Sequence, residues 1–106
     1  MEDLANYKVI ERDPVCIEYR GKNVCGMGPP SSGALAVGQI LGILKNFDIS
    51  AIGDPLDVQA VHLFTQANRL AFANCGKYVG DSDFVDVPVA GMLNKTYLQS
   101  RAALIN

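Results

Sequence analysis

The chain has 106 residues and a formal net charge of −2, from 9 lysines and arginines against 11 aspartates and glutamates. Hydrophobic residues at 49% and charged residues at 19% exclude a disordered chain, because disordered segments lack the apolar surface that offsets the entropy of ordering. At this length we expect residues 1–106 to form a single segment. Binding to nucleic acid by counterion release needs a basic cluster, and because none is present we expect no nucleic-acid partner.

The N-terminus and the longest apolar stretch give no sign of a leader or a membrane span. Met1-Glu2-Asp3 is acidic, whereas a signal peptide opens with basic residues. The apolar stretch at 34–44 includes Gln39 and is far shorter than the roughly 20 residues that cross a bilayer. We therefore expect a soluble segment without a membrane span.

Two strands joined by a turn are the first regular elements expected. Residues 7–27 have an extended pattern in which apolar side chains such as Val15 and Ile17 alternate with more polar ones, and a glycine-containing turn at 20–23 divides the two runs. The glycines and prolines at 26–30 end the second strand, because proline donates no ladder hydrogen bond.

Three cysteines leave the disulfide pattern open. Cys16 and Cys25 are nine residues apart around the expected turn, a spacing that suits facing positions of a hairpin. They either form a bridge or remain free as small apolar residues. Cys75 is expected at the end of a helix as a small apolar residue, and the cysteines do not decide the compartment.

An unusually apolar helix is expected over residues 34–47, capped by one of the serines at 31–32. Its apolar side chains point all the way round, which is typical of a buried helix. Ala34, Gly38 and Gly42 form a narrow stripe that would let another backbone approach closely. Because a chain of 106 residues has difficulty surrounding such a helix, the segment is predicted to belong to something larger.

A second helix is expected from Asp54 as the N-cap and Pro55 as the first helical residue. Apolar residues at helical spacing predict that it runs to about Asn74, with Gly76 just beyond its end. The only histidine, His62, lies on its polar face. Since no acid or second ligand accompanies it at helical spacing, we interpret it as a solvated or interface residue.

The rest of the chain is expected to be an irregular acidic stretch at 78–88 and a helix over about 91–105. Asp81, Asp83 and Asp86 invite a calcium interpretation, but they occupy relative positions 1, 3 and 6, whereas an EF-hand needs oxygen ligands at 1, 3 and 5 and glycine at 6. We interpret them as turn residues and helix caps and expect no metal site.

No residue of this chain is predicted to be catalytic or to bind a cofactor. A serine or cysteine nucleophile needs a base within reach, and only His62 could serve. The stretch at 29–33 is similar to an anion-binding helix start but lacks the glycine-rich loop and lysine of a nucleotide site. Asn94-Lys95-Thr96 matches a glycosylation sequon, whose meaning depends on a secretory context.

Five sequence blocks occur in a fixed order along nearly the whole chain. They are Pro29-Pro30-Ser31-Ser32-Gly33, Gln39-Ile40-Leu41 through Phe47-Asp48, His62 with Arg69-Leu70-Ala71-Phe72-Ala73, residues 78–89, and Leu93-Asn94-Lys95 with Tyr97 and Arg101. In order and spacing these blocks resemble the gamma-glutamyltranspeptidase family, and the Gly80-Asp81-Ser82-Asp83-Phe84-Val85 run is the most specific.

Three departures from that family pattern stand out. Gly33-Ala34 replaces the usual Gly-Gly, Asn74-Cys75 replaces the Asp-Arg that commonly follows Ala-Phe-Ala, and Gln66 replaces a glutamate. Such changes would remove ion pairs or tighten a backbone approach. They indicate a divergent subfamily or an altered subunit contact.

The resemblance implies an α+β segment, mainly helical with an N-terminal hairpin, within the αββα fold of the N-terminal-nucleophile hydrolases. Such enzymes are made as precursors that cut themselves into a large and a small subunit, and the cut exposes a threonine whose own α-amine serves as base. The matched blocks belong to the later part of the large subunit. Thr65 and Thr96 lie in helical stretches and do not match the nucleophile's context, so no catalytic residue is carried over.

The expected function is therefore a scaffold segment of an enzyme that transfers or hydrolyses the gamma-glutamyl group of glutathione and related amides. The 106-residue chain alone is predicted to be inactive, and its partners would be the remainder of the large subunit and the small subunit. The resemblance leaves open whether the complete enzyme acts on a different amide, as acylase-like relatives do. The family suggests a periplasmic or extracellular location. The alternative is an independent non-catalytic module that buries its apolar helices by self-association or against a partner.

Overall fold

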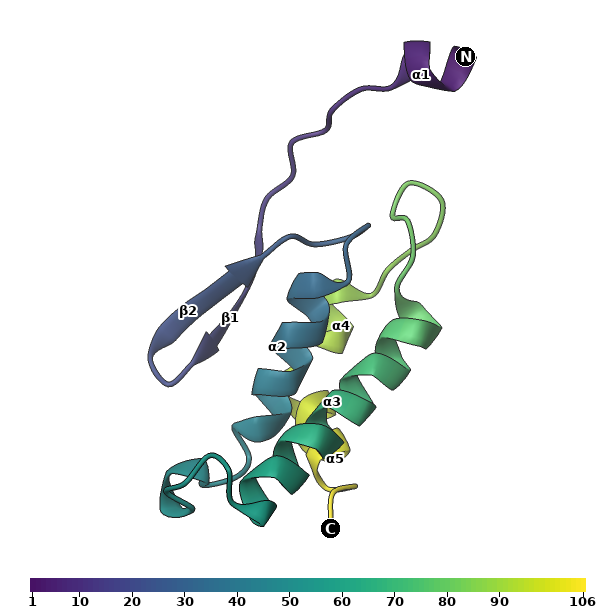
Figure 1. Ribbon diagram of the computed structural model, residues 1–106. Coiled ribbons are helices and arrows are strands. Elements are labelled where there is room, and N and C mark those ends of the chain that lie inside the picture. The colour runs from purple at the N-terminus through teal and green to yellow at the C-terminus, as the bar shows by residue number, and fades with distance from the viewer.

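A two-stranded hairpin and three helices pack around the central helix α2 in the computed structural model, which describes residues 1–106 (Figure 1). The helix α1 and the arm that follows it project away from the rest, and the principal-axis extents are 55 × 25 × 24 Å. In chain order the elements are α1 (Glu2–Asn6), β1 (Val15–Tyr19), β2 (Lys22–Gly26), α2 (Gly33–Leu44), the 3-10 helix η1 (Ile49–Ala51), α3 (Val58–Tyr78), α4 (Val89–Met92) and α5 (Lys95–Ala102).

The hairpin β1–β2 confirms the predicted pair of strands. The strands are antiparallel, in a register that runs from Val15 opposite Gly26 to Tyr19 opposite Lys22. The turn is tighter than expected, because only Arg20 and Gly21 separate the strands, with φ of 51° and 73°. Positive φ at both central residues is the type I′ geometry that matches the twist of paired strands.

The extended stretch predicted from residue 7 becomes a strand only at Val15. Residues 1–14 are all exposed, and the short helix α1 buries no side chain. Within β1, Val15, Ile17 and Tyr19 are half-buried, while the two residues between them are exposed. One face of the hairpin therefore packs on α2 and the other faces outward.

Cys16 and Cys25 settle the open disulfide question on that outward face. They lie directly opposite each other, with 4.1 Å between their Cα atoms, and they form a disulfide. A separation this short is typical of the non-hydrogen-bonded pairs of an antiparallel ladder. Cys75 is free and partly buried near the end of α3, and burial raises the pKa of its thiol.

Helix α2 begins and ends differently from the prediction. Ser32 is its N-cap but makes no side-chain bond, and the hydroxyl of Ser31 accepts instead from the backbone N–H of Gly33 at 3.2 Å. The helix ends at Leu44, three residues early, because the Asn46 side-chain amide donates to carbonyls of its last turn, including that of Gly42 at 3.0 Å. Such a bond satisfies an acceptor that the helix itself leaves free.

The small-residue stripe of α2 is a contact surface, as predicted, but mostly for side chains. A Cβ at Gly38 would lie 2.8 Å from Leu93 Cδ2, and one at Gly42 would overlap Leu98 of α5. Only at Ala34 does another backbone approach closely, where a Cβ at Gly26 of β2 would be 3.2 Å from the Ala34 Cβ. The stripe therefore seats α2 against the hairpin and the C-terminal helices.

The turn between α2 and α3 is organised by a carboxylate. Asp48 Oδ1 accepts from the Ser50 hydroxyl at 2.6 Å and from the backbone N–H of Ala51 at 3.3 Å, which caps η1. The Ser50 hydroxyl, followed by the Ala51 N–H, lowers the pKa of the Asp48 carboxyl because both donors favour its charged form.

Helix α3 starts one turn later than predicted and runs longer. Asp54 forms a turn by accepting from Leu56 N–H at 2.9 Å, and Asp57 is the actual N-cap, accepting from Gln59 N–H at 2.8 Å. At the other end α3 continues through Gly76 to Tyr78, so Gly76 is a helical residue rather than the predicted end.

The helix predicted at 91–105 is two helices. The Asn94 side chain accepts from Tyr97 N–H at 3.1 Å, and this cap starts α5 independently of α4. Stretch 79–88 is irregular as predicted. The main core lies where α2, α3 and α5 meet and consists of Ile43, Leu44, Leu63, Ala67, Leu70, Leu98 and Ala102. No helix is long and apolar enough to cross a membrane.

Candidate functional site

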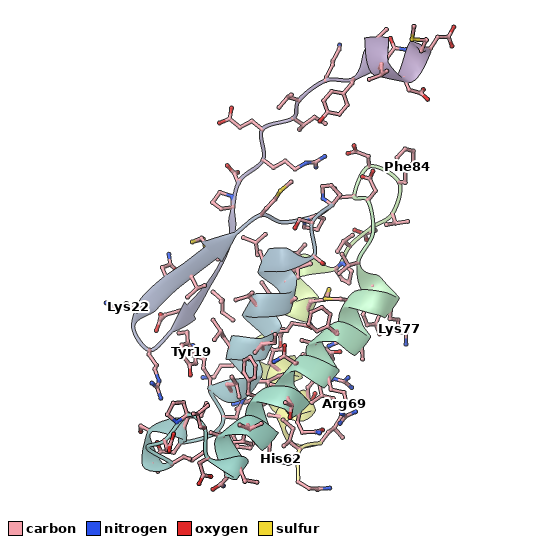
Figure 2. All side chains as sticks on the ribbon, viewed as in Figure 1. Tyr19, Lys22, His62, Arg69, Lys77 and Phe84 are labelled. Carbon is pink, nitrogen blue, oxygen red and sulfur yellow. A yellow bond between two sulfur atoms is a disulfide. The ribbon has the colours of Figure 1, made fainter.

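The side chains considered as nucleophiles or ligands are dispersed. His62, which Figure 2 labels on α3, has its Nε2 2.8 Å from the main-chain oxygen of Asn106. The Thr65 hydroxyl donates to the carbonyl of Val61 at 2.9 Å, within its own helix, and Thr96 is exposed in the first turn of α5. The structure therefore brings together no nucleophile and base.

The acidic loop after α3 forms turn and ion-pair contacts. Asp81 Oδ1 accepts from the backbone N–H of Asp83 at 3.0 Å, and Asp83 Oδ1 lies 3.2 Å from Arg12 Nη2 in the one ion pair of the structure. No three histidine, cysteine, aspartate or glutamate side chains are placed to hold a metal ion. Because the ion pair is solvent-exposed, it contributes little energy, but it links the N-terminal arm to this loop. Phe84 stands at the tip of the loop and is 86% exposed (Figure 2).

A buried polar network joins α2, α3, α4 and α5. Gln39, which is fully buried in α2, donates through Nε2 to the carbonyl of Met92 at 2.9 Å. Its Oε1 accepts from the amide of Asn74 at 3.2 Å, and Asn74 Oδ1 accepts from the Tyr97 hydroxyl at 3.0 Å. Each buried amide thus has partners, which it needs because an unsatisfied buried polar group is costly.

This network explains one departure from the family pattern. Asn74 stands where an aspartate is common, and its amide is the donor to Gln39 Oε1. An ionised carboxylate at position 74 accepts only, so it would require Gln39 to turn its amide away from the Met92 carbonyl. A second departure, Gln66, also lies in α3, and its side-chain oxygen accepts from Arg69 Nε at 2.9 Å. A glutamate at this position would form an ion pair with Arg69 instead.

An apolar trough lies open between α2 and α3. We use this name for the groove, about 460 Å³ in volume, whose six hydrophobic lining residues are Ala36, Val37, Ile40, Leu41, Phe64 and Phe72. Val37, Phe64 and Phe72 are 46%, 57% and 60% exposed. Within residues 1–106, α2 is therefore not covered on this side, which agrees with the expectation that a chain of this length has difficulty surrounding such a helix.

Sequence reasoning noted Gln39 only as an interruption of an apolar helix and did not find the trough. A single amide within an otherwise apolar helix was the available signal for a buried network. The trough had a weaker signal, because Phe64 has the helical spacing of a core residue of α3, yet its side chain is 57% exposed.

Comparison with known proteins identifies the family to which the chain belongs. A family model described as Gamma-glutamyltranspeptidase matches residues 1–106. The chain belongs to the gamma-glutamyltranspeptidase family. This confirms the resemblance found in the five sequence blocks.

Relatives of this gamma-glutamyltranspeptidase family member are much longer than the chain. It is 44% identical over 105 residues to the glutathione hydrolase proenzyme of Escherichia coli (strain K12), covering 99% of this chain and 18% of that protein. It is 42% identical over 103 residues to the Acylase ACY 1 proenzyme of Pseudomonas sp. (strain V22), covering 97% and 18%.

The fold agrees with a solved member of the family. The crystal structure of Helicobacter pylori gamma-glutamyltranspeptidase matches with a TM-score of 0.93 at 41% identity, covering 99% of this chain and 30% of that one. The hairpin and helices described above are thus an α+β part of the larger fold, rather than the whole of it.

Proposed function

We propose that residues 1–106 are a scaffold segment of an enzyme that transfers or hydrolyses the gamma-glutamyl group of glutathione and related amides. One observation carries the proposal: the family match extends over every residue, yet it corresponds to only 18% of the length of the Escherichia coli glutathione hydrolase proenzyme. A segment this short supplies helices and a hairpin, while the reacting groups belong to other parts of such an enzyme.

The dispersed positions of the polar side chains support the proposal that the reacting groups lie elsewhere in the enzyme. The Thr65 hydroxyl is engaged within its helix, and His62 contacts a main-chain oxygen rather than a nucleophile. The resemblance places the nucleophile on a threonine that self-cleavage exposes, at the start of a small subunit. The remainder of the large subunit and that small subunit are therefore the proposed partners.

The test compares the complete natural protein with the 106-residue chain. We expect the complete protein to cleave itself into two subunits, seen as two bands on a denaturing gel, and to hydrolyse a gamma-glutamyl anilide. The 106-residue chain should release no aniline above the buffer blank. Hydrolysis by the short chain, or a complete protein that neither cleaves itself nor hydrolyses the anilide, would refute the proposal.

A second candidate function is hydrolysis of a different amide by the same kind of enzyme. The 42% identity to the Acylase ACY 1 proenzyme favours considering it, since that value is close to the 44% for the glutathione hydrolase. Assaying the complete protein on a gamma-glutamyl anilide and on an acylase substrate, a cephalosporin amide, would separate the two.

A further inference from the structure

The apolar trough carries few groups that would recognise a polar ligand, namely the side chains of Ser32 and Asn68. No residue lining it is charged. Its one side-chain amide, on Asn68, already donates to the carbonyl of Phe64 at 2.7 Å within α3. Apart from these two side chains the trough offers apolar contact area and shape, which is the character of the centre of an interface.

The distribution of charge on α3 reinforces this conclusion. Arg69 and Lys77 lie on the side of the helix turned away from the hairpin, as Figure 2 shows. Phe64 and Phe72, eight residues apart and so about two turns apart on one side of the helix, line the trough with Val37 and Leu41 of α2. Lys77 thus faces solvent away from the trough, whereas the two exposed phenylalanines of α3 both line it.

We infer that an apolar helical segment of the same polypeptide, outside residues 1–106, covers the trough in the intact protein. This inference rests on the proposed function and names the surface through which the scaffold segment meets its parent. The matched region is 18% of the Escherichia coli relative and 30% of the Helicobacter pylori chain, so most of a family member lies outside it. A groove between two helices accepts the side-chain ridge of a third helix.

A second copy of this chain fits the trough less well. The trough is concave, and two identical concave surfaces brought face to face leave a void between them. Voids are disfavoured in protein interfaces, whose central packing density matches that of protein interiors. A convex helical ridge from elsewhere in the polypeptide fills the groove without that penalty.

The test measures access to position 72 in the complete natural protein. Phe72→Cys is made in a Cys75→Ala background, and Lys77→Cys in the same background is the matched control, because Lys77 is exposed and lies about 140° away from Phe72 around α3. Each protein reacts with a maleimide in its native state and in denaturant, and peptide-resolved mass spectrometry follows the added mass. Native rates are divided by the denatured rates, and circular dichroism checks that both variants fold.

We expect Phe72→Cys to react about tenfold or more slowly than Lys77→Cys, at all protein concentrations, because a covered site reacts only when it opens. Similar rates at the two positions would overturn the inference. Protection that disappears on dilution would also overturn it, since it would identify a second copy as the occupant.

A measurement without substitution keeps the inference testable if Phe72→Cys does not fold. Hydroxyl-radical footprinting of the unmodified protein reports oxidation of Phe64 and Phe72 directly. Low oxidation relative to the denatured protein is expected, and oxidation near the denatured level would overturn the inference. Gamma-glutamyl anilide hydrolysis in the same preparation separates the two proposals, because an active enzyme with an open trough refutes only this inference, and an inactive one with a covered trough refutes only the proposed function.

Discussion

Gly42 is the position where a single methyl group has the most specific predicted effect. In the structure a Cβ at Gly42 would overlap the Leu98 side chain, which is only 2% exposed and belongs to the main core. Gly76 in α3 is the matched control, since a Cβ there meets nothing within 4 Å. Both glycines are helical, so replacement by alanine improves helix propensity at both, by about 1 kcal/mol at an interior site.

At Gly42 the gain in helix propensity is opposed by the cost of overpacking the core. Overpacking of a core costs about 1–3 kcal/mol, which outweighs or cancels the propensity gain. We therefore expect Gly42→Ala to lower the free energy of unfolding by about 0–2 kcal/mol, and Gly76→Ala to raise it by about 0.5–1 kcal/mol. For a chain of this size each 1 kcal/mol corresponds to a change in Tm of about 4–8 °C.

Thermal unfolding followed by circular dichroism at 222 nm measures both variants under one set of conditions. Leu98→Val removes the atoms that overlap the new methyl group. Gly42→Ala should therefore lower the free energy of unfolding less in a Leu98→Val background than in the unsubstituted protein. A Gly42→Ala protein as stable as Gly76→Ala would show that α5 does not seat on α2 as described.

Three further perturbations test other contacts. Gln39→Leu leaves buried partners unsatisfied and should lower the free energy of unfolding by about 1–3 kcal/mol in urea titrations; an unchanged midpoint and slope would contradict the network. Replacing Cys16 and Cys25 by serine should cost about 2–3 kcal/mol, and intact-mass measurement of the unsubstituted protein should show two hydrogens fewer than the reduced form. The Ser50 hydroxyl lowers the pKa of Asp48 in the folded state. The ionised Asp48 carboxylate therefore stabilises the fold above its unfolded-state pKa of about 3.9, and this stabilisation is lost as the pH falls through the lower folded-state pKa. Asp48→Asn should therefore weaken the acid-side loss of Tm, and an identical pH profile would refute this.

The hairpin and the apolar trough show which features sequence patterns could predict. The hairpin was predictable because alternation of side chains such as Val15 and Ile17 is a local property of a half-buried strand. The trough was not predictable, because its openness depends on which elements are absent beside α2.

Element boundaries show the same division at a finer scale. Both Asp54 and Asp57 are suitable caps, and the choice of Asp57 depends on the turn that Asp54 makes with Leu56. Likewise, the apolar spacing over 91–105 suits one helix, but the cap at Asn94 divides it. Local spacing does not distinguish such competing hydrogen bonds.

The amino-acid sequence by itself determined the family, the hairpin, the apolar character of α2 and the helical face of α3, since each depends on residue identity or on short-range periodicity. Tertiary structure alone decided that Leu98 overlies Gly42, that Gln39 meets Asn74, and that α2 is left open beside Phe72. These are contacts between segments distant in the chain, and their geometry depends on how whole helices pack rather than on the residues of any one helix.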